Sequence, residues 1–371
     1  MSTEMLTVPV VSRLIQTLVE CESPSDSPAD LRRFMELLAD SLGGEATCRR
    51  SGTHLLCTFK LPGRKKQGQV TALGHGDTVW PLGTLATMPY REEAGRLWGP
   101  GVLDMKAGLA FFIFAMRLLR ERDIPVPHHV ILQVNSDEET GSHTSRALTE
   151  ETARKSKAIL VLEPGTGLTG KLKTARKGIG DYRVRVRGVA SHAGVDFEKG
   201  ASAVVELAKQ IQVIAGFTDL RRGITINPGT VQGGTRSNVI AESAETHVDM
   251  RIPRLRDAAM IEKKFRRLKP FDNRCTLEVT GGLNRPPMER TKGIASLFRL
   301  ARVAAAEVGV DLEESATGGG SDGNFTAALG IPTLDGLGAV GEGAHAAHES
   351  ILTDRIIDRI ETLARLVARI P

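Results

Sequence analysis

Three short polar groups, each placed just after an apolar run, constrain this chain more than any other feature of its sequence. They occupy residues 74–78 (GHGDT), 137–142 (DEETGS) and 162–165 (LEPG). A fourth group, the glycine- and proline-rich loop 97–108, delivers Asp104 just ahead of an apolar helix. In a parallel sheet covered by helices, ligands bind beyond the carboxyl ends of the strands. The sequence therefore predicts that these polar side chains gather at one edge of such a sheet.

The spacing of apolar residues predicts alternating strands and helices in the first half of the chain and again near its end. Such alternation is typical of an α/β fold with a mainly parallel sheet covered by helices. The expected strands are 53–60, 70–73, 130–134, 158–162 and 331–334, and the expected helices are 8–20, 29–42, 106–120, 143–155, 291–308 and 352–369.

The pattern changes near residue 178. Residues 181–187 alternate strictly between polar and apolar, as in an antiparallel strand with one face in water. The following segments predict a small α+β sandwich, with strands at 224–232, 244–252 and 275–280 and helices at 201–215 and 256–268. We therefore expect a discontinuous catalytic domain of residues 1–177 and 287–371, with residues 178–286 inserted as a second domain.

Composition excludes several classes of partner. The net charge is only +5, and no basic cluster carries interleaved aromatic residues, which argues against nucleic acid. No apolar run is long enough to span a membrane and no signal peptide is visible. No two of the four cysteines form a Cys-x-x-Cys pair, so we expect reduced thiols and a cytoplasmic location: Cys21, Cys48, Cys57 and Cys275.

The polar groups fit a centre of two zinc ions. Zinc accepts imidazole nitrogen and carboxylate oxygen, and a pair about 3.5–4 Å apart needs a bridging carboxylate. We expect Asp104 to bridge, His75 and Glu163 to hold one ion, and Glu139 with a late histidine to hold the other. Cobalt and manganese also suit such a carboxylate-rich site.

The adjacent residues Glu138 and Glu139 need different roles. We assign Glu139 as a metal ligand and Glu138 as the general base that takes a proton from water. Asp77 shares a strand face with His75 and is expected to hold its second ring nitrogen. The late histidine is either His345 or His348, and spacing alone does not decide between them.

The motifs at 75–79, 101–108 and 137–142 together resemble the di-zinc aminoacylase and carboxypeptidase family over essentially the whole chain. The resemblance implies the ligand roles given above and a cis peptide bond after Asp104. It places the last ligand at a histidine that is followed three or four residues later by glutamate. His345 with Glu349 fits this pattern best, and His348 is the alternative.

The resemblance also gives the inserted domain a role, as a dimerisation domain that contacts substrate. It implies that His192 reaches the substrate carbonyl oxygen, partly across the dimer. It implies further substrate contacts by Asn238, Arg251 and Arg285, the last in a segment that binds the substrate carboxylate. The run from residue 318 through residue 338 looks closest to the glutamate carboxypeptidase branch, which releases C-terminal glutamate or similar residues from acylated or folate-like substrates.

Other interpretations stay open. One is an N-acyl amino acid deacylase of the acetylornithine deacetylase or desuccinylase type. Another is a serine hydrolase, because residues 319–323 read G-x-S-x-G around Ser321, with Asp335 and His345 following in hydrolase order. A third is a metal-binding protein without catalysis. The G-x-G-x-x-G at 336–341 is discounted, because a loop rather than a helix is expected after it.

Overall fold

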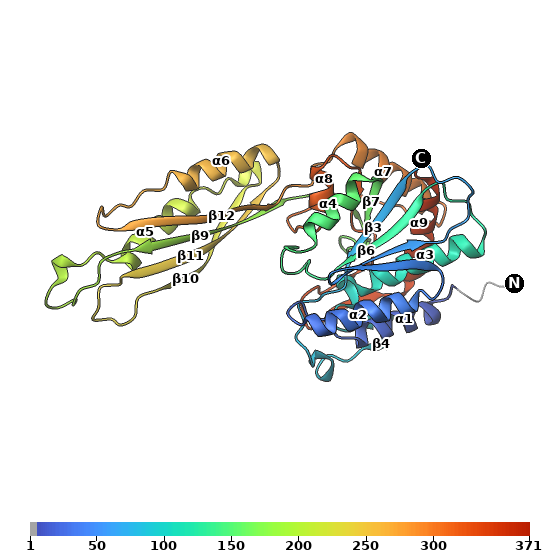
Figure 1. Cartoon of the computed structure of the whole chain (residues 1–371), viewed down its shortest axis with the longest axis horizontal. Helices are drawn as coiled ribbons and strands as arrows, with labels where there is room; N and C mark the ends of the chain where they lie inside the picture. Colours follow the sequence, from blue (N-terminus) through green and yellow to red (C-terminus); the bar gives the residue numbers. More distant parts are fainter. Residues whose placement is uncertain (1–5) are drawn as a thin grey trace. The chain divides into compact units, whose positions relative to one another are not determined.

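The computed structural model describes residues 6–371, which form two compact units (Figure 1). Unit 1 contains the chain up to Ala175 together with Arg290–Thr317 and Ser321–Pro371. Unit 2 contains Arg176–Glu289 and the short segment Gly318–Gly320.

Unit 1 is built on a six-stranded sheet in the order β1-β2-β6-β3-β7-β14. Strands β6, β3, β7 and β14 run parallel to one another. Strand β2 pairs antiparallel with both β6 and β1. The predicted helix-covered, mainly parallel sheet is therefore confirmed. The strands are β1 (Ala46–Ser51), β2 (His54–Phe59), β3 (Gln69–His75), β6 (His129–Asn135), β7 (Ser156–Val161) and β14 (Thr333–Leu334).

Both faces of this sheet are covered. Ala158 and Leu160 of β7 join the main hydrophobic core, whereas Ile159 and Val161 join a smaller cluster on the opposite face. Successive strand residues point to opposite faces, so a continuous apolar run such as β7 requires helices on both sides. The helices of unit 1 are α1 (Val8–Glu20), α2 (Pro28–Ser41), α3 (Ala107–Glu121), α4 (Arg146–Arg154), α7 (Lys292–Ala306), α8 (Gly323–Ala328) and α9 (Ile356–Arg369).

Very short strands, which the apolar pattern does not predict, complete unit 1. Four of them form a second antiparallel sheet in the order β15-β16-β5-β4. It brings the chain around residue 98 beside the chain around residue 350. These strands are β4 (Arg91–Glu93), β5 (Arg96–Trp98), β15 (Gly341–Glu342) and β16 (Ser350–Leu352), and a separate pair is β8 (Leu172–Arg176) with β13 (Glu314–Thr317).

Unit 2 is an antiparallel sheet in the order β10-β11-β9-β12 with two helices. Tyr182, Val184 and Val186 of β9 are buried in a core that includes residues of both helices, while the alternate arginines are less buried. One face of the sheet therefore carries the helices. The elements are β9 (Gly178–Arg187), β10 (Thr225–Gly233), β11 (Ser243–Ile252), β12 (Thr276–Arg285), α5 (Ala203–Ala215) and α6 (Leu255–Arg266) (Figure 1).

One expectation about the cysteines is wrong. Cys48 and Cys57 form a disulfide bond between β1 and β2, while Cys21 and Cys275 are free. The two bonded residues are direct partners in the antiparallel register, with their Cα atoms 4.1 Å apart. A search for Cys-x-x-Cys spacing misses a pair created by strand pairing. The cytoplasmic location thus loses one of its arguments and stays a prediction.

Within residues 6–371, no helix combines the length and the apolar character needed to cross a bilayer.

Candidate metal centre

The carboxyl edge of the main sheet collects the predicted ligands. His75 is the last residue of β3, and Glu163 follows β7 by two residues. Glu139 lies in the loop after β6. Asp104 lies in the irregular turn η2 (Val102–Lys106) ahead of α3, and His345 lies between β15 and β16.

These five side chains converge in unit 1. The Nε2 atom of His75 lies 3.2 Å from Asp104 Oδ1 and 3.6 Å from Glu163 Oε1. The Nε2 atom of His345 lies 3.4 Å from Asp104 Oδ2 and 3.2 Å from Glu139 Oε1. The two oxygens of Asp104 thus face different histidines, which is the arrangement that a bridging carboxylate needs.

His345, rather than His348, is the histidine at this site. Both rings are exposed, but the ring of His345 faces Asp104 and Glu139, whereas the ring of His348 lies beside Gly343. The peptide bond between Asp104 and Met105 is cis, as the resemblance implies.

Glu138 lies at the same site. Its carboxylate, His75 and Glu163 offer ligand atoms within 4.8 Å of one another, as do His75, Asp104 and Glu139. Glu138 is therefore close enough to act on a water molecule held between these groups.

The role of Asp77 differs in detail from the prediction. The Nδ1 atom of His75 donates to the main-chain oxygen of Asp77 at 2.9 Å, and the Asp77 carboxylate is farther from that nitrogen, at 3.5 Å. The carboxylate instead accepts the N–H groups of Glu138 (3.2 Å) and Glu139 (3.1 Å) and the hydroxyl of Ser25 (2.8 Å). Asp77 thus orients the histidine with its main chain and fixes the backbone of the two glutamates with its side chain.

The electrostatics of this site favour a bound cation. Burial raises the pKa of Glu139. Burial alone would lower the pKa of His75, but hydrogen bonds to Asp104, Asp77 and Glu163 outweigh it and hold that pKa well above its usual value. Hydrogen bonds to Asp104 and Glu139 raise the pKa of His345 to about 10. The positive charge of the protonated imidazoles therefore balances the negative charge of the carboxylates. A metal ion that binds here must displace those protons.

The donor set fits a pair of divalent ions. Two imidazole nitrogens and several carboxylate oxygens are the ligands that zinc prefers in catalytic sites. The same set also suits cobalt or manganese, so the donors do not identify the metal.

Comparisons with known proteins agree with this site. The sequence profile described as peptidase family M20/M25/M40 matches residues 72–369. The chain belongs to this family. It is 31% identical over 373 residues to carboxypeptidase G2 of Pseudomonas sp. (strain RS-16), covering 97% of this chain and 89% of that protein.

Two further relatives show the breadth of the M20 family. Succinyl-diaminopimelate desuccinylase of Paracoccus denitrificans is 26% identical over 99% of this chain and 98% of its own length. The YXEP protein of Bacillus subtilis, a dinuclear metal-binding M20 peptidase, has the same fold, with a TM-score of 0.68 at 14% identity over 97% of each chain. The chain is thus an M20 metallopeptidase-type hydrolase, and these relatives do not resolve its substrate.

The predicted substrate-binding residues of this M20 chain lie in unit 2. His192 and Asn238 are on neighbouring segments, because the N–H of Ala193 donates to the main-chain oxygen of Asn238. The Nδ1 atom of His192 accepts the N–H of Gly194 at 3.1 Å, so the proton of the neutral ring belongs on Nε2. His192 is exposed, and its Nε2–H can serve as a donor.

The two predicted arginines differ in their surroundings. Arg251 Nε donates to Asp249 at 2.9 Å and its Nη1 donates to the main-chain oxygen of Gly318 at 3.4 Å. Arg285, the last residue of β12, is buried, with 4% of its surface exposed. Sequence reasoning missed a second buried arginine, Arg176, which donates to the main-chain oxygens of Gly319 and Gly320.

The serine hydrolase interpretation is wrong. Ser321 is fully buried, and its hydroxyl donates to Asp335 at 2.6 Å. An activated serine needs access to substrate and a neighbouring base, usually histidine. The candidate histidine, His345, faces Glu139 and Asp104 instead.

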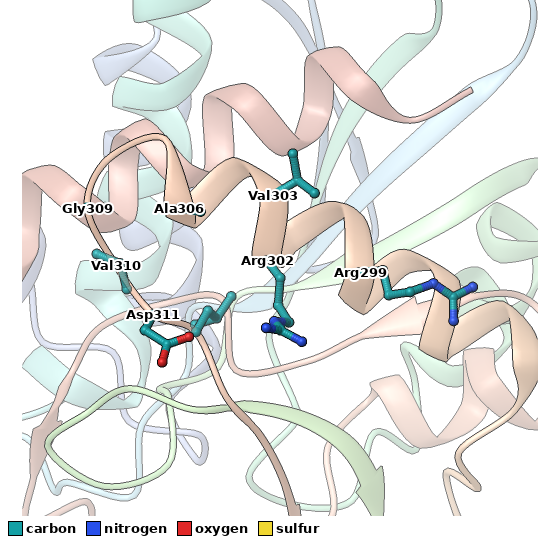
Figure 2. A pocket seen from close by; sticks show the side chains of 8 residues that line it. Arg299, Arg302, Val303, Ala306, Gly309, Val310 and Asp311 are labelled. Carbon is teal, nitrogen blue, oxygen red and sulfur yellow. The ribbon is translucent and has the colours of Figure 1, made fainter.

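A separate cavity of about 600 Å³ lies along α7 (Figure 2). Arg299 and Arg302 of α7 line it together with Asp311 and apolar side chains. None of the predicted ligands lines this cavity, so its size does not make it the catalytic site.

Proposed function

We propose that this protein is a di-zinc hydrolase that cleaves an amide bond and releases a C-terminal amino acid. The leaving residue is glutamate or a similar acidic residue, and the substrate is an N-acyl amino acid, peptide or folate-like molecule. The convergence of His75, Asp104, Glu139, Glu163 and His345 supports this proposal most strongly. The similarity to carboxypeptidase G2 supports the carboxypeptidase direction.

In this proposal, His75 and Glu163 would hold one ion, Glu139 and His345 would hold the other, and Asp104 would serve both. The bound ions supply Lewis-acid polarisation of the amide carbonyl and a lowered pKa for water. Glu138 accepts the proton of the attacking water and returns it to the nitrogen of the leaving amine. Asp77 keeps Glu138 in place for both transfers.

Residues of unit 2 recognise the substrate in this proposal. His192 donates its Nε2 proton to the carbonyl oxygen as negative charge develops there, which is the role of an oxyanion-hole donor. Arg285 binds the substrate carboxylate, since its planar guanidinium matches both oxygens, and Asn238 and Arg251 add polar contacts. The similarity to succinyl-diaminopimelate desuccinylase favours a second candidate, an N-acyl amino acid deacylase.

We also propose a homodimer formed through unit 2. Val204, Val205 and Val213 of α5 expose 42%, 55% and 38% of their surface, and such apolar exposure on one helix suits a protein partner. Light scattering on the purified chain tests this proposal, and a monomer at micromolar concentration would contradict it.

A substrate panel in added zinc tests the activity. The panel varies the leaving residue among glutamate, aspartate, alanine and lysine, and the acyl group among acetyl, succinyl and p-aminobenzoyl. We expect the acidic leaving residues to be released fastest and chelator to stop turnover. Preference for the acyl group regardless of the leaving residue would favour the deacylase. No turnover of any member would favour metal binding without catalysis.

A further inference from the structure

Glu349 is a buried acidic residue that the proposed reaction does not use. It is fully buried just before β16, and its carboxylate accepts four hydrogen bonds. Oε1 accepts the N–H groups of Leu103 (2.8 Å) and Asp104 (3.0 Å). Oε2 accepts the N–H of Gly101 (2.9 Å) and the indole N–H of Trp80 (2.8 Å).

We propose that Glu349 is a positioning residue that shapes the Asp104 turn and so makes the ion at Asp104, Glu139 and His345 bind tightly. This inference rests on the metal centre proposed above. Its basis is that three of the four donors are main-chain groups of the turn that carries the bridging carboxylate.

The turn needs such an acceptor. Asp104 and Met105 have φ, ψ values of −116°, 93° and −135°, 31°, which are not helical. The N–H groups of Leu103 and Asp104 point to a carboxylate, whereas in a regular helix such groups point to carbonyl oxygens. A buried N–H without an acceptor is costly, and a charged acceptor makes a stronger hydrogen bond than a neutral one.

The same short segment carries His345. The N–H of Glu349 donates to the main-chain oxygen of Ala346 at 2.9 Å, and this bond closes the turn from Ala346 to Glu349, directly after His345. His345 has a φ of 63°, a left-handed conformation that non-glycine residues adopt only when their surroundings hold it. Glu349 therefore ties the turn of Asp104 to the turn of His345.

The two ions should respond differently when the hydrogen bonds between Glu349 and the Asp104 turn are lost. His75 ends β3 and Glu163 follows β7 by two residues, so the main sheet and not the 343–349 segment sets their positions. Asp104 and His345 both depend on that segment. We therefore expect the ion at Glu139 and His345 to weaken more than the ion at His75 and Glu163, which depends on this segment only through Asp104.

The test compares full-length Glu349→Gln and Glu349→Asp with wild type. Glutamine keeps the shape but places an NH₂ group against N–H donors, and aspartate keeps the charge but withdraws the carboxylate. The matched control is Glu206→Gln in unit 2. Glu206 is also buried and accepts the N–H groups of Phe271 (2.9 Å) and Asp272 (3.1 Å).

The readouts are zinc affinity by chelator competition and amide hydrogen exchange of the metal-free protein. We expect wild type and Glu206→Gln to bind two zinc ions. In both Glu349 variants the zinc at Asp104, Glu139 and His345 should lose about 10- to 100-fold in affinity, and the zinc at His75 and Glu163, which shares only Asp104, should lose less. The amides of Gly101, Leu103 and Asp104 should exchange at least about ten-fold faster, because they lose their acceptor.

Unchanged affinity for both ions, or unchanged exchange of these amides, would overturn the proposal. If Glu349→Gln does not fold, Glu349→Asp decides between the same outcomes. Failure of wild type to bind two ions would instead refute the metal centre. In that case, exchange of the three amides still reports whether Glu349 shapes the turn.

Discussion

At the scale of single residues, the pair Glu138 and Glu139 illustrates how neighbours acquire different roles. Both main-chain N–H groups are held by Asp77, which leaves the two side chains to diverge. Glu139 faces His345, while Glu138 is grouped with His75 and Glu163. Adjacent positions in the sequence therefore reach different parts of one site.

Replacing Glu138 by glutamine should lower kcat by about 10²- to 10⁴-fold, the usual contribution of a general base. Zinc content should stay at the wild-type value, because the variant keeps every proposed ligand. Steady-state kinetics with metal analysis checks this expectation, and Glu139→Gln, which should lose zinc, is the control. Loss of zinc from Glu138→Gln would make Glu138 a ligand instead.

His345 and His348 form a natural matched pair. His345→Ala should weaken one zinc by at least the roughly 10- to 100-fold typical of residues behind a ligand, since it removes a ligand itself. His348→Ala should bind zinc as wild type does, because the ring of His348 lies beside Gly343, while it is His345 that faces Asp104 and Glu139. Titration of both variants with zinc measures this, and the opposite ranking would move the ligand to His348.

At the scale of elements, the β1–β2 hairpin supports the loop that carries the two glutamates. His54, at the start of β2, is 4% exposed, and its Nδ1 accepts the N–H of Ser136 at 3.3 Å. Its Nε2 lies 3.2 Å from the hydroxyl of Thr144. The hairpin therefore contacts both ends of the 136–144 loop.

This contact predicts a dependence of stability on pH. Burial lowers the pKa of His54, so the folded chain keeps the ring neutral while the unfolded chain takes up a proton near the usual value of 6.5. The unfolded state then binds more protons, and stability falls as the pH drops below about 6.5, by at most about 1.4 kcal/mol per pH unit for one proton. Stability stops falling once the pH is below the lowered pKa of His54 in the folded chain.

Denaturant unfolding of wild type and His54→Gln between pH 7.5 and about 5 measures this effect, since glutamine does not titrate. The difference in unfolding free energy between the two proteins should shift in favour of His54→Gln on acidification. Parallel pH profiles would show that His54 is not the titrating group.

At the scale of the whole molecule, metal should stabilise unit 1 alone, because all five proposed ligands lie there. Zinc at about 100 times its dissociation constant adds about 2.7 kcal/mol to the stability of the form that binds it. That corresponds to a Tm increase of about 5 °C or more. In calorimetry with chelator, only the transition of unit 1 should move. A shift of both transitions would show that the two units unfold together.

Much of the fold follows from the sequence by itself. The apolar periodicity predicts the strands β3, β6 and β7 and the long helices, because burial on a sheet or along a helix face imposes a local repeat on the chain. The same strands fix where His75, Glu139 and Glu163 lie, since parallel strands end at a common edge. That part of the site needs no distant contact to be recognised.

The tertiary structure alone decided the rest. The strands that join the Asp104 turn to the His345 segment have only two or three residues, too few for a periodic signal. Other contacts likewise join residues that are not neighbours in the sequence. They are the Cys48–Cys57 bond, the four hydrogen bonds to Glu349 and the burial of Ser321 against Asp335. Such contacts depend on how segments pair in space, which local propensity does not encode. Spacing alone therefore left His345 and His348 open, and only the folded chain brings His345 to Asp104 and Glu139.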